Sequence, residues 1–199
     1  MALIAEILSS CWGAGRIFLF DHRGYQYFNF SRQGFWRSFL AALLVAPLFL
    51  AIMAAQQRLA AHGATPQQLA AVPSLARTLA IELLAYPLYW GAFPLLMLWL
   101  VRLLGVSARY TPYIIVYNWS GVVAAAIEAV PYLLLGVHVL PTGLLQPSVF
   151  ASVVIALVYR WSIAHTVLGI GTFAAVGVVF TDLLLGLAIA MLAQTVLLS

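Results

Sequence analysis

Lysine is absent from this 199-residue chain, and charged residues of any kind make up only 7% of it. An ordinary soluble domain contains roughly 25% charged residues. Hydrophobic residues account for 65% of the sequence, and the mean hydropathy is +1.06. This composition excludes a conventional water-soluble fold and predicts an integral membrane protein.

Cysteine is also scarce, because Cys11 is the only one. A single cysteine excludes an internal disulfide and leaves no cysteine cluster for a structural metal site. The four histidines are spread over different expected depths, so we expect no metal site. The hydrolase patterns GxSxG and HExxH are missing as well. We therefore expect a protein that is not an enzyme and uses no cofactor.

Arginine carries all of the positive side-chain charge, and nine arginines against five acidic residues give a formal net charge of +4. These arginines lie near the ends of apolar segments rather than among interleaved aromatic residues. That distribution argues against nucleic-acid binding. The expected partners are the lipid bilayer and other membrane proteins.

Long apolar runs are the main feature that is present. A membrane-spanning helix needs about 20 predominantly apolar residues, and five segments meet this requirement. They cover roughly residues 34 to 55, 77 to 101, 112 to 136, 148 to 168 and 172 to 196. We therefore predict an all-α polytopic membrane protein whose residues 34–199 form a five-helix transmembrane domain.

Residues 1–33 form a separate N-terminal segment. It starts without a basic residue and carries Glu6, so we expect it to be retained rather than cleaved as a signal peptide. Apolar residues recur at helical spacing over residues 2–20, with Glu6, Ser9, Ser10 and Arg16 on other faces. This pattern predicts an amphipathic helix that lies on the membrane interface. Ser31 is the expected N-cap of the first span.

The arginine distribution predicts the orientation. Seven arginines fall on one expected side and two, Arg58 and Arg77, on the other. The positive-inside rule then places the N-terminus in the cytoplasm and the C-terminus outside, in a bacterial cytoplasmic (inner) membrane. In the external first loop, Thr65, Pro66 and Gln68 have the spacing of a short capped surface helix.

Arg160 and Asp182 are charged residues inside the fourth and fifth predicted spans. They lie at similar distances on either side of an expected turn near Leu168–Gly171, so they should reach nearly the same depth. We expect an ion pair that clamps the two spans. Two alternatives are an ion or proton relay, and an Arg160 side chain that extends to the cytoplasmic face. His165 is expected to be a packed side chain.

A second polar group is predicted between the second and third spans. Counting from an expected turn near Gly105 puts Glu82 and Glu128 at one level. If the two helices face each other, both carboxyls line one pocket, and mutual repulsion together with desolvation should keep at least one of them protonated. The full candidate polar pocket consists of Glu82, Tyr86, Tyr89, Asn118, Glu128 and Tyr132.

Two interpretations of this pocket stay open. In the first, both residues are structural: Glu82 reaches the external lipid headgroups, and Glu128 is a hydrogen-bonded contact between helices. In the second, they bind a cation, a proton or a polar ligand. Prolines in three of the spans suggest the broken helices of transporters, although proline is common in membrane helices. These prolines are Pro47, Pro87, Pro94 and Pro131.

Two passages share a pattern of a glycine, a small or hydroxyl residue and a short break that leads into a helix. They are "GVSARYTPYIIVYNWSG" from Gly105 and "LGIGTFAAVGVV" from Leu168. With five spans and a cytoplasmic N-terminus, the chain resembles the Yip family of five-span membrane proteins, in its bacterial form, over about residues 35 to 198. The resemblance implies a non-enzymatic helical bundle that organises membranes through protein contacts. The Asp-Leu-Tyr-Gly-Pro motif of the GTPase-binding relatives is absent, so GTPase binding is not implied.

Two functions follow as hypotheses. The first is a membrane-organising or protein-interaction component of Yip-like layout. The alternative is a small transport or substrate-binding membrane subunit that uses the pocket around Glu82 and Glu128. A continuous polar cavity there favours the alternative, whereas tight packing favours the first.

Overall fold

The computed structural model of the chain describes residues 3–61, 65 and 74–198. The described residues form α-helices and short 3-10 helices, with no strand among them. The α-helices are α1 (Leu3–Phe18), α2 (Arg32–Ser38), α3 (Leu40–Ala61), α5 (Leu75–Leu103), α6 (Tyr110–Gly136), α7 (Leu145–Leu168) and α8 (Thr172–Leu198). The 3-10 helices are η1 (His22–Tyr27), η2 (Ser107–Arg109) and η3 (Thr142–Leu144).

Five helical segments are long and apolar enough to cross a membrane, which confirms the predicted all-α architecture and the five spans. They are Arg32–Ala60, Ala76–Leu103, Ser107–Gly136, Thr142–Leu168 and Thr172–Val196. The first span extends beyond its predicted end at residue 55 because α3 continues through the polar run Gln56 to Arg58. The predicted short helix that starts at Thr65 falls largely outside the described residues.

Helix starts and ends follow local signals. Ser31 caps α2 as predicted, since its hydroxyl accepts a hydrogen bond of 3.1 Å from the Gly34 amide. The four span prolines all lie inside continuous helices and do not break the spans. Proline is tolerated there because surrounding helices satisfy the backbone groups that it frees.

The two predicted turns near Gly105 and Gly169 lie together at one end of the bundle. Both glycines have positive φ angles, +70° and +59°, which only glycine adopts without strain. The Arg109 guanidinium packs directly on Gly169, where an added Cβ would lie 1.9 Å from it. It also donates to the Val167 carbonyl at 3.4 Å. This contact joins the α5–α6 turn to the α7–α8 turn.

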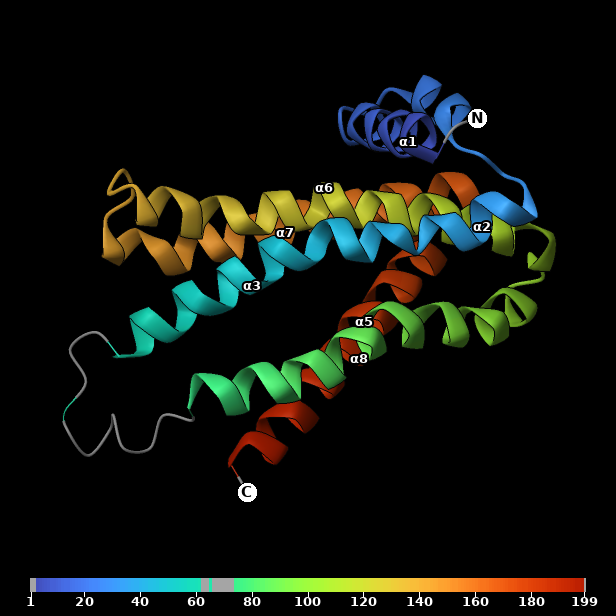
Figure 1. Ribbon diagram of the computed structural model, residues 1–199. Helices are drawn as coiled ribbons and strands as arrows, with labels where there is room; N and C mark the ends of the chain where they lie inside the picture. Colours follow the sequence, from blue (N-terminus) through green and yellow to red (C-terminus); the bar gives the residue numbers. More distant parts are fainter. Residues whose placement is uncertain (1–2, 62–64, 66–73, 199) are drawn as a thin grey trace.

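The spans are arranged in two layers (Figure 1). Helix α6 packs against α7 and α3 in one layer, and α5 packs against α8 in the other. The layers meet at the end that carries α2 and the two glycine turns, and they diverge toward the opposite end. The N-terminal region lies near the first end and α8 finishes toward the second.

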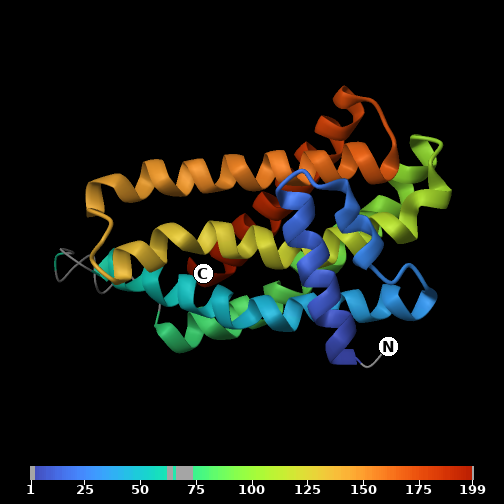
Figure 2. The same ribbon diagram turned by 90° about the horizontal axis from the view of Figure 1, so that it is seen from above.

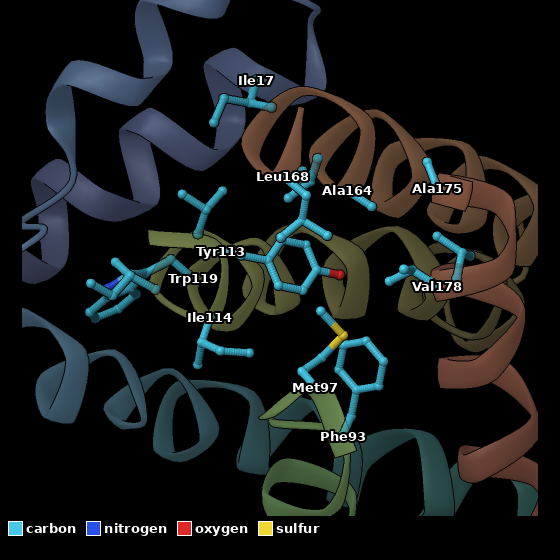
Figure 3. Close-up of a cluster of buried hydrophobic side chains, with 14 of the residues drawn as sticks. Ile17, Phe93, Met97, Tyr113, Ile114, Trp119, Ala164, Leu168, Ala175 and Val178 are labelled. Carbon is cyan, nitrogen blue, oxygen red and sulfur yellow. The ribbon is translucent and has the colours of Figure 1, made fainter. Parts of the chain in front are cut away.

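Large apolar side chains fill the end where the layers meet (Figure 3). Phe93 and Met97 of α5 contact a cluster from α6 that includes Tyr113 and Trp119, and Leu168 of α7 completes it. These side chains are fully buried. We call this region the closed half of the bundle.

Helix α1 crosses the outside of α6, as Figure 2 shows from above. It is amphipathic as predicted, but its polar face points toward the protein. Glu6, Ser10 and Gly13 are buried, while the apolar side chains on the other side are exposed. These exposed residues are Leu3, Ile4, Leu8, Trp12 and Leu19. An exposed apolar face of this kind suits a helix that contacts lipid.

Specific polar contacts explain why α1 turns this face inward. The Glu6 carboxylate accepts a bond of 2.7 Å from Arg37 of α2 and one of 3.1 Å from the Asn29 amide. The Tyr159 hydroxyl of α7 donates to the Ala14 carbonyl at 2.7 Å. A buried carboxylate needs such partners because desolvation without them is costly.

Candidate functional site

Arg160 of α7 and Asp182 of α8 form the ion pair that the turn arithmetic predicts. The Arg160 Nη1 atom lies 2.7 Å from Asp182 Oδ2, and both side chains are largely buried. An isolated charge in the middle of a spanning helix costs roughly 2.5 to 3.5 kcal/mol on insertion scales, and pairing offsets part of this cost. The Arg160 guanidinium is therefore directed at α8, where Asp182 binds it.

Tyr117 of α6 completes this cluster, and the sequence argument missed it. Its hydroxyl donates to Asp182 Oδ1 at 2.8 Å, and the Arg160 guanidinium lies 4.8 Å from the centre of its ring. Tyr117 precedes Glu128 by eleven residues, which places the two within about 20° on a helix. That spacing was the signal available in the sequence. Three spans therefore contribute to one charged cluster.

The cluster faces a partly open space between the spans that we call the central cavity. It consists of two adjoining cavities of about 220 and 330 Å³, which share Tyr89, Tyr117, Glu128 and Arg160 as lining residues. The first also contacts α3 and the second also contacts α8. All five spans thus surround the central cavity, in the part of the bundle beyond the closed half.

Glu128 faces the central cavity, but Glu82 does not. Glu82 lines a neighbouring apolar pocket of about 280 Å³ between α3 and α5, which shares Phe49 and Tyr86 with the first cavity. The two carboxyls therefore do not line one pocket as predicted. The expectation that at least one of them is protonated stays a prediction. The prediction of a shared pocket assumed that α5 and α6 pack along their whole length. Helices α5 and α6 contact at Phe93 and Tyr117, whose ring centroids are 4.7 Å apart, but α5 packs mainly on α8.

The other predicted pocket residues are divided between different places. Tyr86 and Tyr89 line the central cavity. Asn118 is fully buried in the closed half, where its amide donates to Ser38 at 2.9 Å. Asn118 lies ten residues before Glu128, about 80° away on the helix, and this angle explains its separation. Tyr132 lies nearer the far end of α6 and accepts a bond of 3.0 Å from Gln56 of α3.

His165 has the packing role that was expected. Its ring stacks on Trp161 with centroids 5.5 Å apart, and its Nδ1 lies 2.7 Å from the Ile170 carbonyl oxygen. Among the described residues, no group of three or more histidine, cysteine, aspartate or glutamate side chains is placed to hold a metal ion.

Outside the spans, a second charged contact ties α1 to η1. Arg16 pairs with Asp21, and the Arg16 Nε atom lies 2.9 Å from Asp21 Oδ2. The hydrogen bond from Arg16, with a backbone bond from Arg23, lowers the pKa of the Asp21 carboxyl. Burial raises the pKa of the Cys11 thiol on the same helix.

Comparisons with protein-family models, with curated proteins and with solved structures gave no match. Any assignment of function to this bundle therefore has to come from the geometry of its own residues.

Proposed function

We propose that the protein is a small transport or binding subunit that takes up an ionic or polar solute in the central cavity. The observation that carries the proposal is the cluster of Arg160, Asp182, Tyr117 and Glu128 on a cavity surrounded by all five spans. Ionisable side chains inside a membrane are functional candidates by default because they are costly.

A purely structural clamp explains less of this geometry. Arg160 and Asp182 are enough to lock α7 to α8, and the Tyr117 hydroxyl supplies the further hydrogen bond that a buried pair needs. A clamp does not require the cavity beside the pair, which also contains the carboxyl of Glu128. A cavity with a few convergent polar groups is the usual form of a ligand site.

The proposed orientation keeps the N-terminus in the cytoplasm and the C-terminus outside, in a bacterial cytoplasmic membrane. Since Arg160 is held in the cluster, it no longer counts as a topology signal, and six arginines against two support this orientation. The closed half would then face the cytoplasm, and the end where the layers diverge would face outward.

The test is ligand-dependent stability of the purified protein. We expect at least one small ion or polar solute to raise the melting temperature in detergent with saturable dependence on concentration. Ala125→Leu, which fills the cavity, should abolish this shift. Ala126→Leu, on the exposed side of the same helix turn, should preserve it. No stabilisation by any solute, or equal stabilisation of both variants, would contradict the proposal.

The second candidate function is a non-enzymatic membrane-organising component of Yip-like layout. It is favoured by the contact of Arg109 with Gly169, which brings the two similar passages together at one end, and by the exposed apolar face of α1. Its test is native mass spectrometry of complexes extracted in mild detergent. A stoichiometric protein partner that is retained by Ala125→Leu would support this candidate, because the cavity would not be needed.

A further inference from the structure

The charges in the central cavity do not cancel. Arg160 is paired with Asp182 at 2.7 Å, and the second oxygen of Asp182 is occupied by the Tyr117 hydroxyl at 2.8 Å. Glu128 makes no hydrogen bond or ion pair with the part of the chain that the structure describes. With Glu128 ionised, the cavity has a net charge of −1, and a monovalent cation would neutralise it.

The wall of the cavity indicates the kind of cation. Aromatic rings from α3, α5 and α6 line the cavity of about 220 Å³ beside Glu128: Phe49, Tyr86, Tyr89, Trp90 and Tyr117. Several of them are in mutual contact, with ring centroids 5.0 Å apart for Phe49 and Tyr86 and 6.4 Å apart for Tyr86 and Trp90. Aromatic faces attract amine and quaternary ammonium groups by about 0.5 to 2 kcal/mol per contact.

An inorganic cation fits this wall less well. Hard metal cations are held by several oxygen ligands. The Tyr86 hydroxyl is already bonded to the Ala42 carbonyl, and the Tyr117 hydroxyl is bonded to Asp182. Apart from the Arg160 guanidinium, which is paired with Asp182 and lies against the Tyr117 ring, the remaining surface of the cavity is mostly ring and aliphatic carbon. Such a surface favours a cation that carries its own apolar groups.

We propose that the central cavity binds a small monovalent organic cation, an amine or a quaternary ammonium, with Glu128 as its counter-charge and the aromatic rings as its wall. This inference rests on the proposed function and names the substrate class of the same site. Cavities that hold drug-sized ligands measure roughly 300 to 1,000 Å³, so the ligand is at the lower end of that size range.

In this arrangement Asp182 is a positioning residue. It pairs with the Arg160 guanidinium, which lines the same cavity as Glu128, so that Arg160 forms its ion pair with Asp182 and not with Glu128. Without Asp182, Arg160 would pair with Glu128 and remove the negative charge that the ligand needs. Asp182 thus maintains the site without contacting the ligand.

The experiment compares choline with its neutral isostere 3,3-dimethylbutan-1-ol, and with sodium and acetate at constant ionic strength. Binding to the purified protein is measured by tryptophan fluorescence and by melting temperature. We expect choline to bind saturably, and the other solutes to bind at least tenfold more weakly. Glu128→Gln should weaken the binding of choline at least tenfold, which corresponds to a loss of about 1.4 kcal/mol of binding free energy. Glu82→Gln, a carboxyl outside the cavity, should leave the affinity unchanged.

Two further variants test the wall and the positioning role. Trp90→Leu should weaken the binding of choline severalfold, because the cation loses contact with one aromatic ring face. Asp182→Asn should weaken it at least tenfold, whereas the double substitution Arg160→Leu with Asp182→Leu should restore binding, because the cavity regains its net charge of −1. A merely structural Asp182 would lower the melting temperature of the unliganded variants and leave their affinity for choline unchanged. If Glu128→Gln fails to fold, Glu128→Asp should fold and retain choline binding.

The outcomes separate this inference from the function on which it rests. Binding of acetate, of the neutral alcohol or of sodium at least as strong as that of choline overturns the organic-cation proposal and leaves the proposed binding function intact. Failure of every solute to bind overturns both. Choline binding that is unaffected by Glu128→Gln places the cation elsewhere and overturns the site.

Discussion

The closed half of the bundle and the region around the central cavity are built from the same five spans, yet they are packed differently. In the closed half, large side chains such as Phe93, Met97 and Trp119 interdigitate and are fully buried. Around the cavity, the inward positions of α6 carry Gly121, Ala125 and Glu128, and two cavities adjoin there. Close packing stabilises one region, and its absence leaves room for a ligand in the other.

This difference shows that one part of the bundle provides stability and another part leaves room for a ligand. Between membrane helices there is little hydrophobic driving force, so close packing and polar contacts provide association. The closed half holds the layers together through packing. The cavity region contains the ion pair between Arg160 and Asp182, and it tolerates charged groups because that pair offsets their cost.

The largest expected effect is in the cavity region. Arg160→Leu or Asp182→Leu alone should destabilise the protein by about 3 to 5 kcal/mol, because each strands an uncompensated buried charge. The double substitution should cost less than either single one. Melting temperatures in detergent, analysed as a double-mutant cycle, check this. Additive losses would show that the pair does not stabilise the α7–α8 contact.

A slightly smaller effect is expected in the closed half. Trp119→Ala should destabilise the folded protein by about 3 kcal/mol. This value is at the low end for such truncations, because the helices remain in lipid after they separate. The control is Trp99→Ala, since Trp99 is 67% exposed. Thermal unfolding in detergent measures both variants. Equal losses would mean that the closed half does not carry the packing that we assign to it.

The third prediction concerns the docking of α1 on the closed half of the bundle. Glu6→Gln should weaken this docking by about 1.5 to 3 kcal/mol, since it removes the charge that binds Arg37. The readout is faster alkylation of Cys11, the only thiol in the chain, which is half-buried on α1. Arg32→Gln is the control, because Arg32 is exposed and forms no ion pair within the described residues. Unchanged alkylation would show that Glu6 does not hold α1.

The smallest effect concerns pH and lies outside the spans. The folded-state pKa of Asp21 is lowered by Arg16, so the pair stabilises the fold above the unfolded pKa and loses this contribution as pH falls below about 4. Asp21→Asn should lower the melting temperature slightly at pH 7 and have no effect near pH 2. A difference that persists at pH 2 would exclude ionisation as its cause.

The two regions also differ in how well the sequence predicts their side-chain contacts. Counting residues along the two helices from a turn was sufficient where the residues lie close to that turn. Arg160 and Asp182 flank the glycine turn at 169, and their pairing followed from equal distances along two adjoining helices. The same counting failed for Glu82 and Glu128, which are 23 residues from Gly105 on either side. Over that length, two helices joined by a turn are free to diverge and to pack on other partners.

For α1, the sequence indicated an amphipathic helix but not which face the protein would bury. The periodicity placed Glu6 off the apolar stripe, without a partner for its carboxylate. In the structure, Arg37 and Asn29 bind it, so the polar face is the buried one. Both partners are more than 20 residues away in the chain, which is why local periodicity did not reveal them.

The sequence by itself determined that the protein is built for a membrane, the number of spans, and the helix boundaries near glycine and serine. These depend on composition, periodicity and local backbone preference, which act within about one helix length. Only the tertiary structure decided that α5 joins α8 rather than α6, and that Tyr117 and Glu128 share a cavity with the ion pair. Those choices depend on side-chain packing between helices distant in sequence, where many arrangements bury the same apolar faces.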